Sequence, residues 1–588
     1  MTNKLSAWGR TGTGFHGSLR GADAPRRSDT FEGRFGRMFR SLPAANYSTE
    51  HLTALGEAMT AGPEIMRKDD KPEGEPLRDP QGRMIPKATK EQEPGQPKVA
   101  PDDEENFGIP AGYTYLGQFI DHDITFDPMS SLMQQNDPEA LIDFRTPRLD
   151  LDNLYGRGPA DQPYMYVQDK MFRLSERALT RGPVASKALD LQRLGDRAVI
   201  GDKRNDENVI VSQLQGVFLN FHNAVVQDMP AAEFETVQRS VRWHYQWIVL
   251  HDFLPRMVGQ KMVDAILPHL SAKNGNLQDQ PPNLNYYKWR NEPFMPIEFA
   301  AAAYRFGHSM VRPIYRLSQG LTGPSMDRDL GLDTGVSGRK FIFAALRNRG
   351  LNGFESFPSD WGIDWSLFFE LGHKLDPARL GPDRVQPSYK IDTSLVNPLA
   401  FLPEFSQKLP GSSNDLVADK DGFPTPQAGQ ISNLATRNLL RGWAMRLPSG
   451  QSVARHMGLE PIADRDLKVG KAIFDDIGTN RSILHYGQSR HGEGNGFRDN
   501  APLWFYVLAE AQHQWTEAVK GRAGDKAVIN ATPVHLGPVG GRIVAEVLIG
   551  LLVGDSSSFL RQHPTWKPGY AMGGKFGMPE LIKKSGLA

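Results

Sequence analysis

Apolar residues that recur every three or four positions dominate the long segments of this 588-residue sequence. One such series, typical of a helix with one buried face, consists of Leu214, Val217, Phe218, Phe221 and Val225. Further helices are expected over residues 237–258, with an interruption near Pro255, and over residues 503–519 and 541–554. Alternating strand patterns are scarce. The sequence therefore predicts a mainly α fold, with one large helical domain, long loops and little β structure.

The first hundred residues differ in composition from the rest. From Met66 to Asn106 the chain is dense in proline and charge, as in "KDDKPEGEPLRDP" and "KEQEPGQPKVAPDDEEN". Such a composition is typical of a surface loop or linker. We therefore expect an N-terminal extension with a linker over residues 1–106 and the main, catalytic domain over residues 107–588.

Charge and cysteine content exclude several classes of protein. Because 68 Lys and Arg residues balance 68 Asp and Glu residues without a long basic block, nucleic acid is not an expected partner. The absence of cysteine excludes disulfides, thiolate metal ligands and cofactors held through a cysteine thiolate or thioether. No apolar segment near the N-terminus reads as an ordinary signal peptide, and the best membrane candidate, residues 543–553, is too short and contains Glu546. We expect a soluble protein, cytoplasmic or exported by another route, without a membrane span.

The segment "GYTYLGQFIDHDITFDP" places Asp121, His122 and Asp123 at the end of an apolar run. Acidic residues are almost never fully buried unless they are paired or bound to a metal. Consecutive residues of a helix point about 100° apart, so one surface cannot use all three in the same way. The triplet is therefore either an ordinary solvated turn or a place where each residue faces a different partner.

A second segment, "RTPRLDLDNLYGRG", carries alternating polar residues at Thr146, Arg148, Asp150 and Asp152. A calcium ion requires several oxygen ligands around one point, although the glycine and the glutamate of an EF-hand are missing here. The alternatives are a calcium site and a solvated acidic loop.

Two further segments carry polar residues in unusual places. In "GDKRNDENVIVSQLQGVF", Arg204 and Glu207 are three residues apart at the expected start of a helix, where the simplest interpretation is an i,i+3 salt bridge. In "AAAYRFGHSMVRP", His308 follows a helix-like run over residues 299–306. A lone histidine is more often a satisfied core residue than a ligand. Gly307, however, would let a flat ligand approach closely, as a haem held by one neutral imidazole requires.

Together these segments resemble the animal-type haem peroxidases, or peroxidase-cyclooxygenase superfamily, from about Gly112 to Leu560. Five motifs follow the family's order. Taken together, they favour the functional interpretation of each motif over the simpler one. They are Gln-x-x-Asp-His-Asp at 118–123, Thr-x-x-x-Asp-x-Asp at 146–152, Arg-x-x-Glu at 204–207, Arg-x-Gly-His at 305–308 and "RNLLRGWAMRLP" at 437–448.

The resemblance implies a role for each matched residue around the haem iron. His122 would be the distal acid–base, Arg204 would stabilise the charge that develops as the O–O bond breaks, and Gln118 would reach the distal water or halide. His308 would be the proximal iron ligand, and Asn438 would accept the hydrogen bond from its other ring nitrogen.

The resemblance also implies how the cofactors are held. Asp121 and Glu207 would form ester bonds to methyl groups of haem b, with Arg305 also at the haem. The calcium ion would be bound by Asp123, Thr146, Arg148 (through its carbonyl), Asp150 and Asp152. The expected activity is that of an oxidoreductase that reduces hydrogen peroxide and, through a ferryl intermediate, oxidises halides, thiocyanate or small phenols.

Departures from the family narrow this expectation. In the most oxidising mammalian members, a methionine directly after the ester glutamate forms a sulfonium bond to the haem, whereas this chain has Asn208. Iodide, thiocyanate, bromide and organic donors are therefore expected rather than chloride. The absence of the disulfides of the secreted animal enzymes indicates a bacterial member.

Two alternatives remain open. A fatty-acid oxygenase of the same superfamily would carry a radical tyrosine three residues before the proximal histidine, where this chain has Arg305, with Tyr304 one residue away. An inactive calcium-dependent binding module is the second alternative, although His122, Arg204 and His308 are all present.

Overall fold

The computed structural model describes residues 33–60, 104–126, 142–143, 145–270, 277, 279–319, 339–345, 350–377, 383–410, 415–419, 423–473, 479–488, 495–522, 529 and 532–588. Helices make up 43% of the structure, and the few strands are short and form no closed sheet within the part of the chain that is described. The predicted mainly α fold is confirmed.

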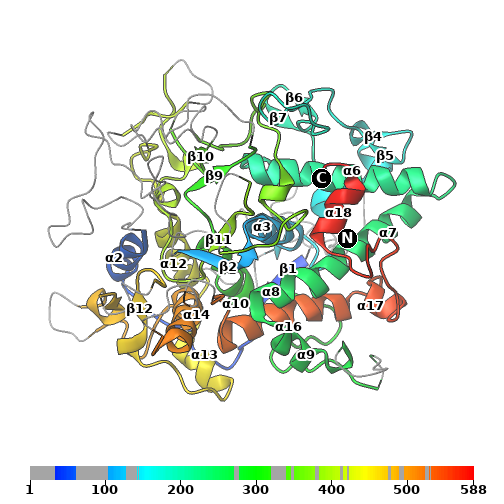
Figure 1. Cartoon of the computed structure of the whole chain (residues 1–588). Coiled ribbons are helices and arrows are strands. Elements are labelled where there is room, and N and C mark those ends of the chain that lie inside the picture. Colours follow the sequence, from blue (N-terminus) through cyan, green and yellow to red (C-terminus); the bar gives the residue numbers. More distant parts are fainter. Residues whose placement is uncertain are drawn as a thin grey trace, which may run out of the picture.

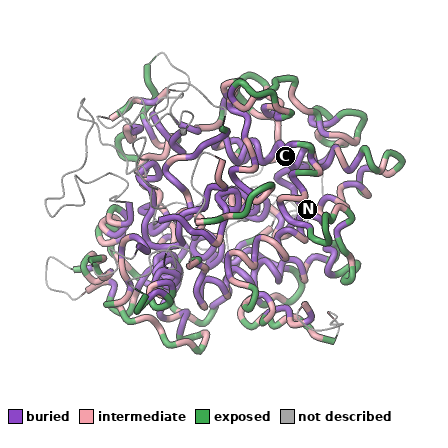
Figure 2. Tube along the Cα trace, viewed as in Figure 1, coloured by how far each residue is buried: buried purple, intermediate pink, exposed green. Residues whose placement is uncertain are grey.

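Long helices surround α3 near the centre of the molecule (Figure 1). They are α3 (Gly112–Ile124), α6 (Val209–Asp228), α7 (Phe234–Ile248), α14 (Leu503–Val519) and α16 (Pro538–Gly554). Helix α6 packs against both α3 and α7, and α14 packs against α16. The predicted helices at 214–225, 503–519 and 541–554 are therefore confirmed. Buried segments gather at this centre and exposed segments lie at the rim (Figure 2).

Shorter helices complete the helical body. They are α2 (Thr49–Thr60), α4 (Asp152–Tyr155), α5 (Gly158–Asp161), α8 (Leu254–Val258), α9 (Gln260–Ile266), α10 (Ile297–Ala300), α12 (Leu434–Ala444), α13 (Gly450–His456), α17 (Phe559–Gln562) and α18 (Met578–Ser585). Two 3-10 segments, η4 (Lys203–Asp206) and η7 (Ala303–His308), carry residues of the predicted site. The expected helix-like run at 299–306 is thus divided between α10 and η7.

The interruption expected near Pro255 lies just before the proline. Helix α7 continues into a π-helical segment, η5 (Val249–Phe253), and then into α8. Proline has no backbone N–H, and in a regular α-helix its ring clashes with the carbonyl four residues earlier, here that of His251. The wider π turn accommodates the ring without ending the helix.

Short strands connect segments that are far apart in the sequence. They are β1 (Gly33–Gly36), β2 (Glu105–Pro110), β3 (Ile142–Asp143), β4 (Tyr166–Val167), β5 (Met171–Phe172), β6 (Arg193–Leu194), β7 (Arg197–Ala198), β8 (Met295–Pro296), β9 (Ile314–Arg316), β10 (Arg339–Phe341), β11 (Pro387–Tyr389), β12 (Lys468–Val469) and β13 (Arg481–Ser482). Strand β1 lies between β3, which is antiparallel to it, and β8, which is parallel.

Residues 33–60 pack against the main body. In addition to the pairing of β1, α2 packs against α12. The buried carboxylate of Glu298 accepts hydrogen bonds from the backbone N–H groups of Met38 (3.0 Å) and Phe39 (3.2 Å). Most of the expected linker, residues 61–103, lies outside the described residues. The division of the chain at residue 106 stays a prediction.

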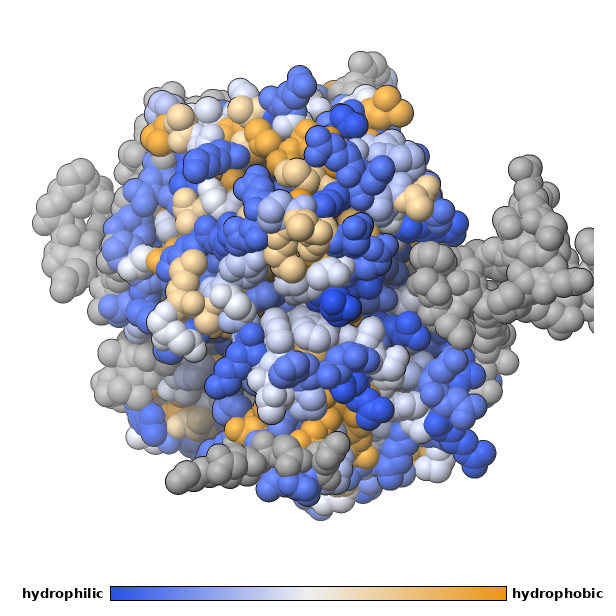
Figure 3. Space-filling model, turned by 90° about the vertical axis from the view of Figure 1, so that its right-hand side faces the viewer, coloured by the Kyte–Doolittle hydropathy of each residue, from blue (hydrophilic) through white to orange (hydrophobic). Residues whose placement is uncertain are grey.

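Helix α6 is, among the described residues, the one helix long and apolar enough to cross a membrane. Its most apolar stretch is 89% buried inside the fold, as in a core helix. The face turned toward the viewer in Figure 3 is largely hydrophilic, with small hydrophobic patches scattered over it.

Candidate active site

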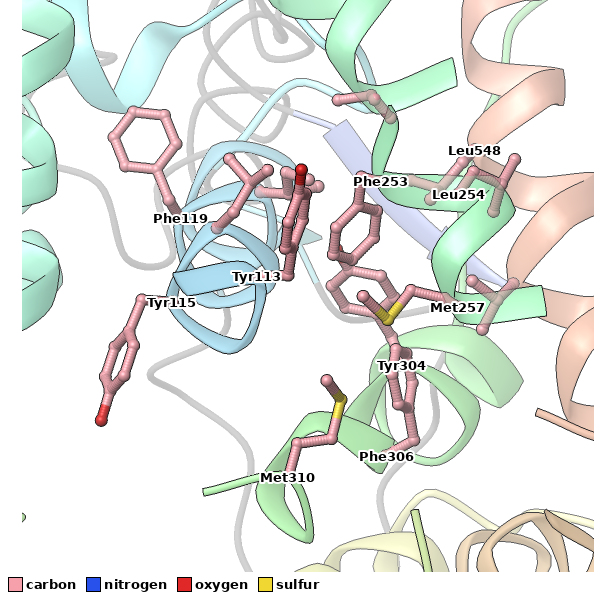
Figure 4. Close-up of a cluster of buried hydrophobic side chains, with 14 of the residues drawn as sticks. Tyr113, Tyr115, Phe119, Phe253, Leu254, Met257, Tyr304, Phe306, Met310 and Leu548 are labelled. Carbon is pink, nitrogen blue, oxygen red and sulfur yellow. The ribbon is translucent and has the colours of Figure 1, made fainter. Parts of the chain in front are cut away.

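A cavity of about 630 Å³ lies where α3, η4 and η7 meet, within the roughly 300–1,000 Å³ of typical ligand pockets. Its apolar lining includes Tyr113, Tyr115, Phe253, Met257, Tyr304, Phe306 and Met310 (Figure 4). Its polar lining includes Gln118, Asp121, His122, Arg204, Glu207, Arg305 and His308. The cavity therefore brings together residues that the sequence analysis selected from three separate motifs.

The Asp-His-Asp triplet forms the last full turn of α3, and its three side chains have different surroundings. Asp121 lines the cavity, where the Thr125 hydroxyl donates to its Oδ1 at 3.0 Å. His122 is buried and also lines the cavity, whereas Asp123 is fully buried beside Asp150 and Asp152. Of the two alternatives, the solvated turn is wrong.

The imidazole of His122 is held by a buried amide that the sequence analysis did not select. Its Nδ1 lies 2.7 Å from Asn205 Oδ1, and Asn205 Nδ2 donates to Gln215 Oε1 on α6 at 2.8 Å. An amide oxygen can only accept, so Nδ1 carries the hydrogen and Nε2 is the basic nitrogen. Burial, together with Arg204, lowers the pKa of His122 to about 3, which keeps the ring neutral.

Arg204 does not form the expected salt bridge with Glu207. Helix α6 begins only at Val209, and Arg204 lies before it on η4, where its Nη2 pairs with Asp202 Oδ2 at 2.8 Å. The same nitrogen donates to the carbonyls of His122 (3.1 Å) and Thr125 (2.7 Å). The guanidinium thus lies at the carbonyl end of α3, where the helix dipole favours a cation.

Asp202 provides the counter-charge of Arg204. Burial opposes ionisation of its carboxyl group, but Arg204 and Arg145 outweigh burial and hold its pKa well below the usual range. Arg145 donates to Asp202 through Nε at 3.1 Å. Arg204 lines the cavity, and within the described residues its Nη1 has no hydrogen-bonding partner.

Glu207, Gln118 and Asn208 form a hydrogen-bonded row at the cavity wall. Gln118 Nε2 donates to Glu207 Oε1 at 2.9 Å, and Asn208 Nδ2 donates to Gln118 Oε1 at 3.2 Å. Burial, reinforced by Glu404, raises the pKa of Glu207 to about 7. Asn208 Oδ1 also caps α6 by accepting from the N–H groups of Ile210 (3.1 Å) and Val211 (2.9 Å).

His308 ends η7 and lines the same cavity. Burial and Arg305 lower the pKa of His308 to about 3, so its imidazole is neutral, as a metal ligand must be. A Cβ atom built on Gly307 would meet no atom within 4 Å, so the space beside the histidine is open.

Asn438 from α12 reaches His308 but presents its amide nitrogen rather than its oxygen. Asn438 Nδ2 lies 2.7 Å from His308 Nδ1, and its Oδ1 accepts from Arg305 Nη1 at 2.9 Å. The expected acceptor role of Asn438 is therefore not the orientation found here. Arg305 can only donate and so attracts the oxygen. A half-turn of the amide would restore the expected contact once Nδ1 carries a hydrogen.

Three carboxylates from α3, the loop before α4 and the first residue of α4 converge outside the cavity. Asp123, Asp150 and Asp152 each offer an oxygen within 4.8 Å of the others. Leu151, between Asp150 and Asp152, has a left-handed backbone (φ 60°), a conformation that costs roughly 1–2 kcal/mol for a residue with a Cβ atom. Thr146 Oγ1 donates to Asp150 Oδ2 at 2.8 Å. Arg148, predicted to contribute its carbonyl, donates its N–H to the Thr146 carbonyl at 2.8 Å.

This cluster has too few protein partners for its charge. Both oxygens of Asp123 and Oδ1 of Asp152 lack hydrogen-bonding partners among the described residues, and the nearest cation is Arg145, 3.5 Å from Asp152. Burial and the neighbouring Asp150 raise the pKa values of Asp123 and Asp152 well above the usual range. Buried carboxylates without partners are costly unless a metal neutralises them, and this oxygen-only set suits a hard dication.

Three supporting residues were missed by sequence reasoning, namely Asp202, Asn205 and Gln215. Only Gln215 could have been detected from the sequence, as an amide next to Leu214 within the apolar series of α6. Tyr304, which bears on the oxygenase alternative, lines the cavity, stacks on Phe299 at 4.5 Å and donates to the Gly117 carbonyl at 3.3 Å.

Comparisons with known proteins show similarity in sequence and in fold. Residues 131–334 match the family model of the animal haem peroxidases. The chain is 30% identical over 123 residues to a "Peroxidase-like protein" from Margaritifera margaritifera, a segment covering 20% of this chain and 14% of that protein. The chain therefore spans only a small part of that relative's length.

Solved structures are similar to this chain at low sequence identity. Peroxidase A from Dictyostelium discoideum has a TM-score of 0.51 and 13% identity, covering 95% of this chain and 94% of that one. The fatty acid alpha-dioxygenase from Oryza sativa has a TM-score of 0.47 and 15% identity, covering 83% and 75%. Residues 131–334 are thus similar to the animal haem peroxidase family, and the chain shares the helical fold of Peroxidase A.

Proposed function

We propose that this chain is a haem peroxidase that reduces hydrogen peroxide and oxidises small donors. The observation that supports this most is that one cavity holds two neutral histidines from different elements, His122 and His308, with Arg204 beside the first. Two neutral imidazoles supply a metal ligand and a general base, the two functions that peroxide cleavage requires.

Haem b fits the residues of this cavity. Aromatic and apolar side chains suit a flat macrocycle, His308 offers a neutral nitrogen, and Gly307 leaves open space beside it. Bound there, the haem iron would supply the site that binds peroxide and exchanges electrons with it. Asn438 and Arg305 set the orientation of the His308 ring.

His122 moves the proton in this proposal. Its free Nε2 takes the proton from one peroxide oxygen and returns it to the leaving oxygen, acting first as base and then as acid. Asn205 keeps the hydrogen on Nδ1 throughout, so Nε2 alone is available. Arg204 stabilises the negative charge that develops on oxygen, because its guanidinium group is positively charged.

The proposed donors are iodide, thiocyanate, bromide and phenols. Asn208 has no sulfur with which to form a third covalent link to the haem, and its carboxamide is committed to the cap of α6 and to Gln118. For this reason, chloride is not among the proposed donors.

Spectra of purified protein with haem, before and after peroxide, test the function. Peroxide-dependent oxidation of iodide or a phenol supports the proposal. Oxygen uptake with a fatty acid in the absence of peroxide would favour the oxygenase instead. Calcium binding without haem binding would favour an inactive binding module.

A charge introduced at Asn205 should change the pH dependence of the reaction with peroxide. The pKa of His122 is lowered to about 3. Its base form is therefore complete above that value, and the rate should be nearly flat over roughly pH 5 to pH 8. Asn205→Asp keeps an acceptor at Nδ1 but adds a negative charge that favours imidazolium, so its rate should fall on the acid side. Stopped-flow rates across this range check both statements. Equal profiles in the two proteins would show that the protonation of His122 does not control the rate over this range.

We further propose a structural calcium ion at Asp123, Asp150 and Asp152, with Thr146 and the Arg148 carbonyl as the remaining protein ligands. The ion would neutralise carboxylates that lack protein partners and would join the end of α3 to the loop before α4. Since Asp123 directly follows His122, the ion would also fix the catalytic histidine.

Removal of calcium should lower the melting temperature by about 2–5 °C, the effect of losing a ligand that is present well above its dissociation constant. The loss should be larger at alkaline pH. In the folded protein without metal, the pKa values of Asp123 and Asp152 are raised. The free energy of unfolding of the metal-free protein is therefore highest below the unfolded pKa values of these groups and decreases as the pH rises. Calorimetry with and without chelator measures the shift. Asp123→Asn should abolish the calcium response, and Asp161→Asn, at an exposed carboxylate nearby, should retain it. Active protein without calcium would contradict the proposal.

We also propose that Asp121 and Glu207 form ester bonds to haem methyl groups after exposure to peroxide. Both carboxyl groups line the cavity, and burial raises the pKa of each despite nearby arginines. After peroxide treatment, acidified solvent should extract little haem. Asp121→Ala and Glu207→Ala should each leave one link, and the double variant should release its haem. Denaturing gels stained for haem and mass spectrometry of the peptides check this, and freely extractable haem in the matured parent protein would refute it.

A further inference from the structure

Gln118 has a set of contacts that the proposed peroxide chemistry does not use. Both ends of its carboxamide are engaged, Nε2 by Glu207 Oε1 at 2.9 Å and Oε1 by Asn208 Nδ2 at 3.2 Å. The resemblance assigns Gln118 to the distal water or halide. Here its nearest chemical partner is instead the carboxyl group of Glu207.

The three residues belong to two different parts of the fold. Gln118 lies on α3, one turn before His122, whereas Glu207 and Asn208 lie between η4 and α6. The position of Asn208 is itself fixed, because its Oδ1 accepts from two N–H groups of the first turn of α6. Its Nδ2 is then directed at Gln118, and the orientation of the Gln118 amide follows, since its oxygen must face that donor.

The backbone around Glu207 is held equally firmly. The Glu207 carbonyl accepts from Gly353 N–H at 3.0 Å, and the carbonyl of Asp206 accepts from Phe354 N–H at 2.7 Å. Arg193 binds both oxygens of the Asp206 carboxylate, at 2.7 and 2.8 Å. With the backbone fixed, the remaining freedom of Glu207 is rotation of its side chain, and Gln118 restrains this rotation.

We propose that Asn208 and Gln118 form a clamp that positions Glu207 for its covalent bond to the haem. The clamp engages Oε1 and leaves Oε2 as the oxygen that reacts. Gln118 and Asn208 are thus positioning residues, and Asn208, which replaces the sulfur-bearing residue of related enzymes, supports the neighbouring ester instead of forming a bond of its own. The inference rests on the proposed function, because it requires haem and peroxide.

The bond-forming step balances with hydrogen peroxide as the oxidant. A C–H bond of the haem methyl group and the O–H bond of the Glu207 carboxyl group break, and a C–O bond forms between the methyl carbon and Oε2. Two electrons and two protons leave. Hydrogen peroxide accepts them and becomes two molecules of water.

The amount of haem linked at Glu207, relative to that linked at Asp121 in the same sample, tests the clamp. Asp121 lies on α3 outside the clamp, so the ratio is independent of how much haem is bound. In Gln118→Leu the ratio should fall at least about fivefold at a fixed number of peroxide equivalents, since one hydrogen bond that orients the reacting group is lost. Mass spectrometry of the haem-bearing peptides measures both links.

Asn208→Ser provides the matched control for the helix cap. Serine caps a helix about as well as asparagine, but its hydroxyl is too short to reach Gln118. The ratio should therefore fall in Asn208→Ser while the melting temperature stays near that of the parent. The double variant should be no worse than Gln118→Leu alone, because Asn208 acts through Gln118.

The outcomes separate this inference from the proposal it rests on. Equal ratios in the parent and Gln118→Leu overturn the clamp and leave the ester bonds intact. If the decreases in the ratio add up in the double variant, Asn208 does not act through Gln118. Fully extractable haem in the matured parent overturns the ester bonds and the clamp together.

Discussion

His308→Ala should lose most of its haem and all measurable peroxidase activity. Among the described residues, His308 is the histidine at the end of η7 that opens onto the cavity beside Gly307, and the chain has no cysteine that could replace it as an iron ligand. Burial keeps its imidazole neutral, and a neutral imidazole is the form that binds a metal. Haem content by absorbance and turnover with iodide measure the loss.

Two controls make this result specific. His373→Ala removes an exposed histidine and should keep both haem and activity. Imidazole added to His308→Ala should restore part of the haem absorbance, because the truncated side chain leaves space for the small ligand. A normal Soret band with full turnover in His308→Ala, without added imidazole, would show that another group binds the iron.

His122→Ala should slow the reaction with peroxide by at least about 10²-fold, the usual contribution of a positioned acid–base. The structure gives the reason, since Nδ1 is committed to Asn205 and Nε2 is the free base. Stopped-flow mixing with peroxide isolates this step. Subsequent oxidation of the donor should change less, because it needs no proton transfer by His122.

Variants of Arg204 distinguish the effect of its positive charge on the reaction with peroxide from the effect of its planar shape. Arg204→Lys keeps the positive charge but loses the planar group that binds Asp202 and the carbonyls of His122 and Thr125 together. It should therefore be slower than the parent protein and faster than Arg204→Ala. Parent-like rates with peroxide in both His122→Ala and Arg204→Ala would show that the proton transfer proposed here is wrong.

The sequence predicted those features that depend on local patterns. Helices α6, α14 and α16 were expected because their apolar residues recur at helical spacing over several turns. Helix α7 was expected as well, but not the π turn before Pro255, because a proline signals a disturbance without specifying how the backbone absorbs it.

The contacts within the site could not be predicted in the same way. Arg204 and Glu207 fit an i,i+3 pair in sequence, yet Asp202 lies closer to the guanidinium once η4 has formed. The orientation of Asn438 depends on Arg305, which lies 133 positions away in the sequence. Resemblance selected the residues of the site, but their partners follow from tertiary packing, which short motifs do not encode.

The contact between Glu298 and residues 38–39 indicates how much of the chain is needed for a stable fold. Glu298 belongs to α10, which directly precedes η7 and His308, and its buried carboxylate is matched by the amides of Met38 and Phe39. A chain shortened to begin at residue 107 would leave that carboxylate without these donors and β8 without its partner strand β1. A buried acceptor left unpaired costs roughly 1–3 kcal/mol. The side of the cavity that carries His308 therefore depends for its stability on a segment that precedes Gln118 by some eighty residues of sequence.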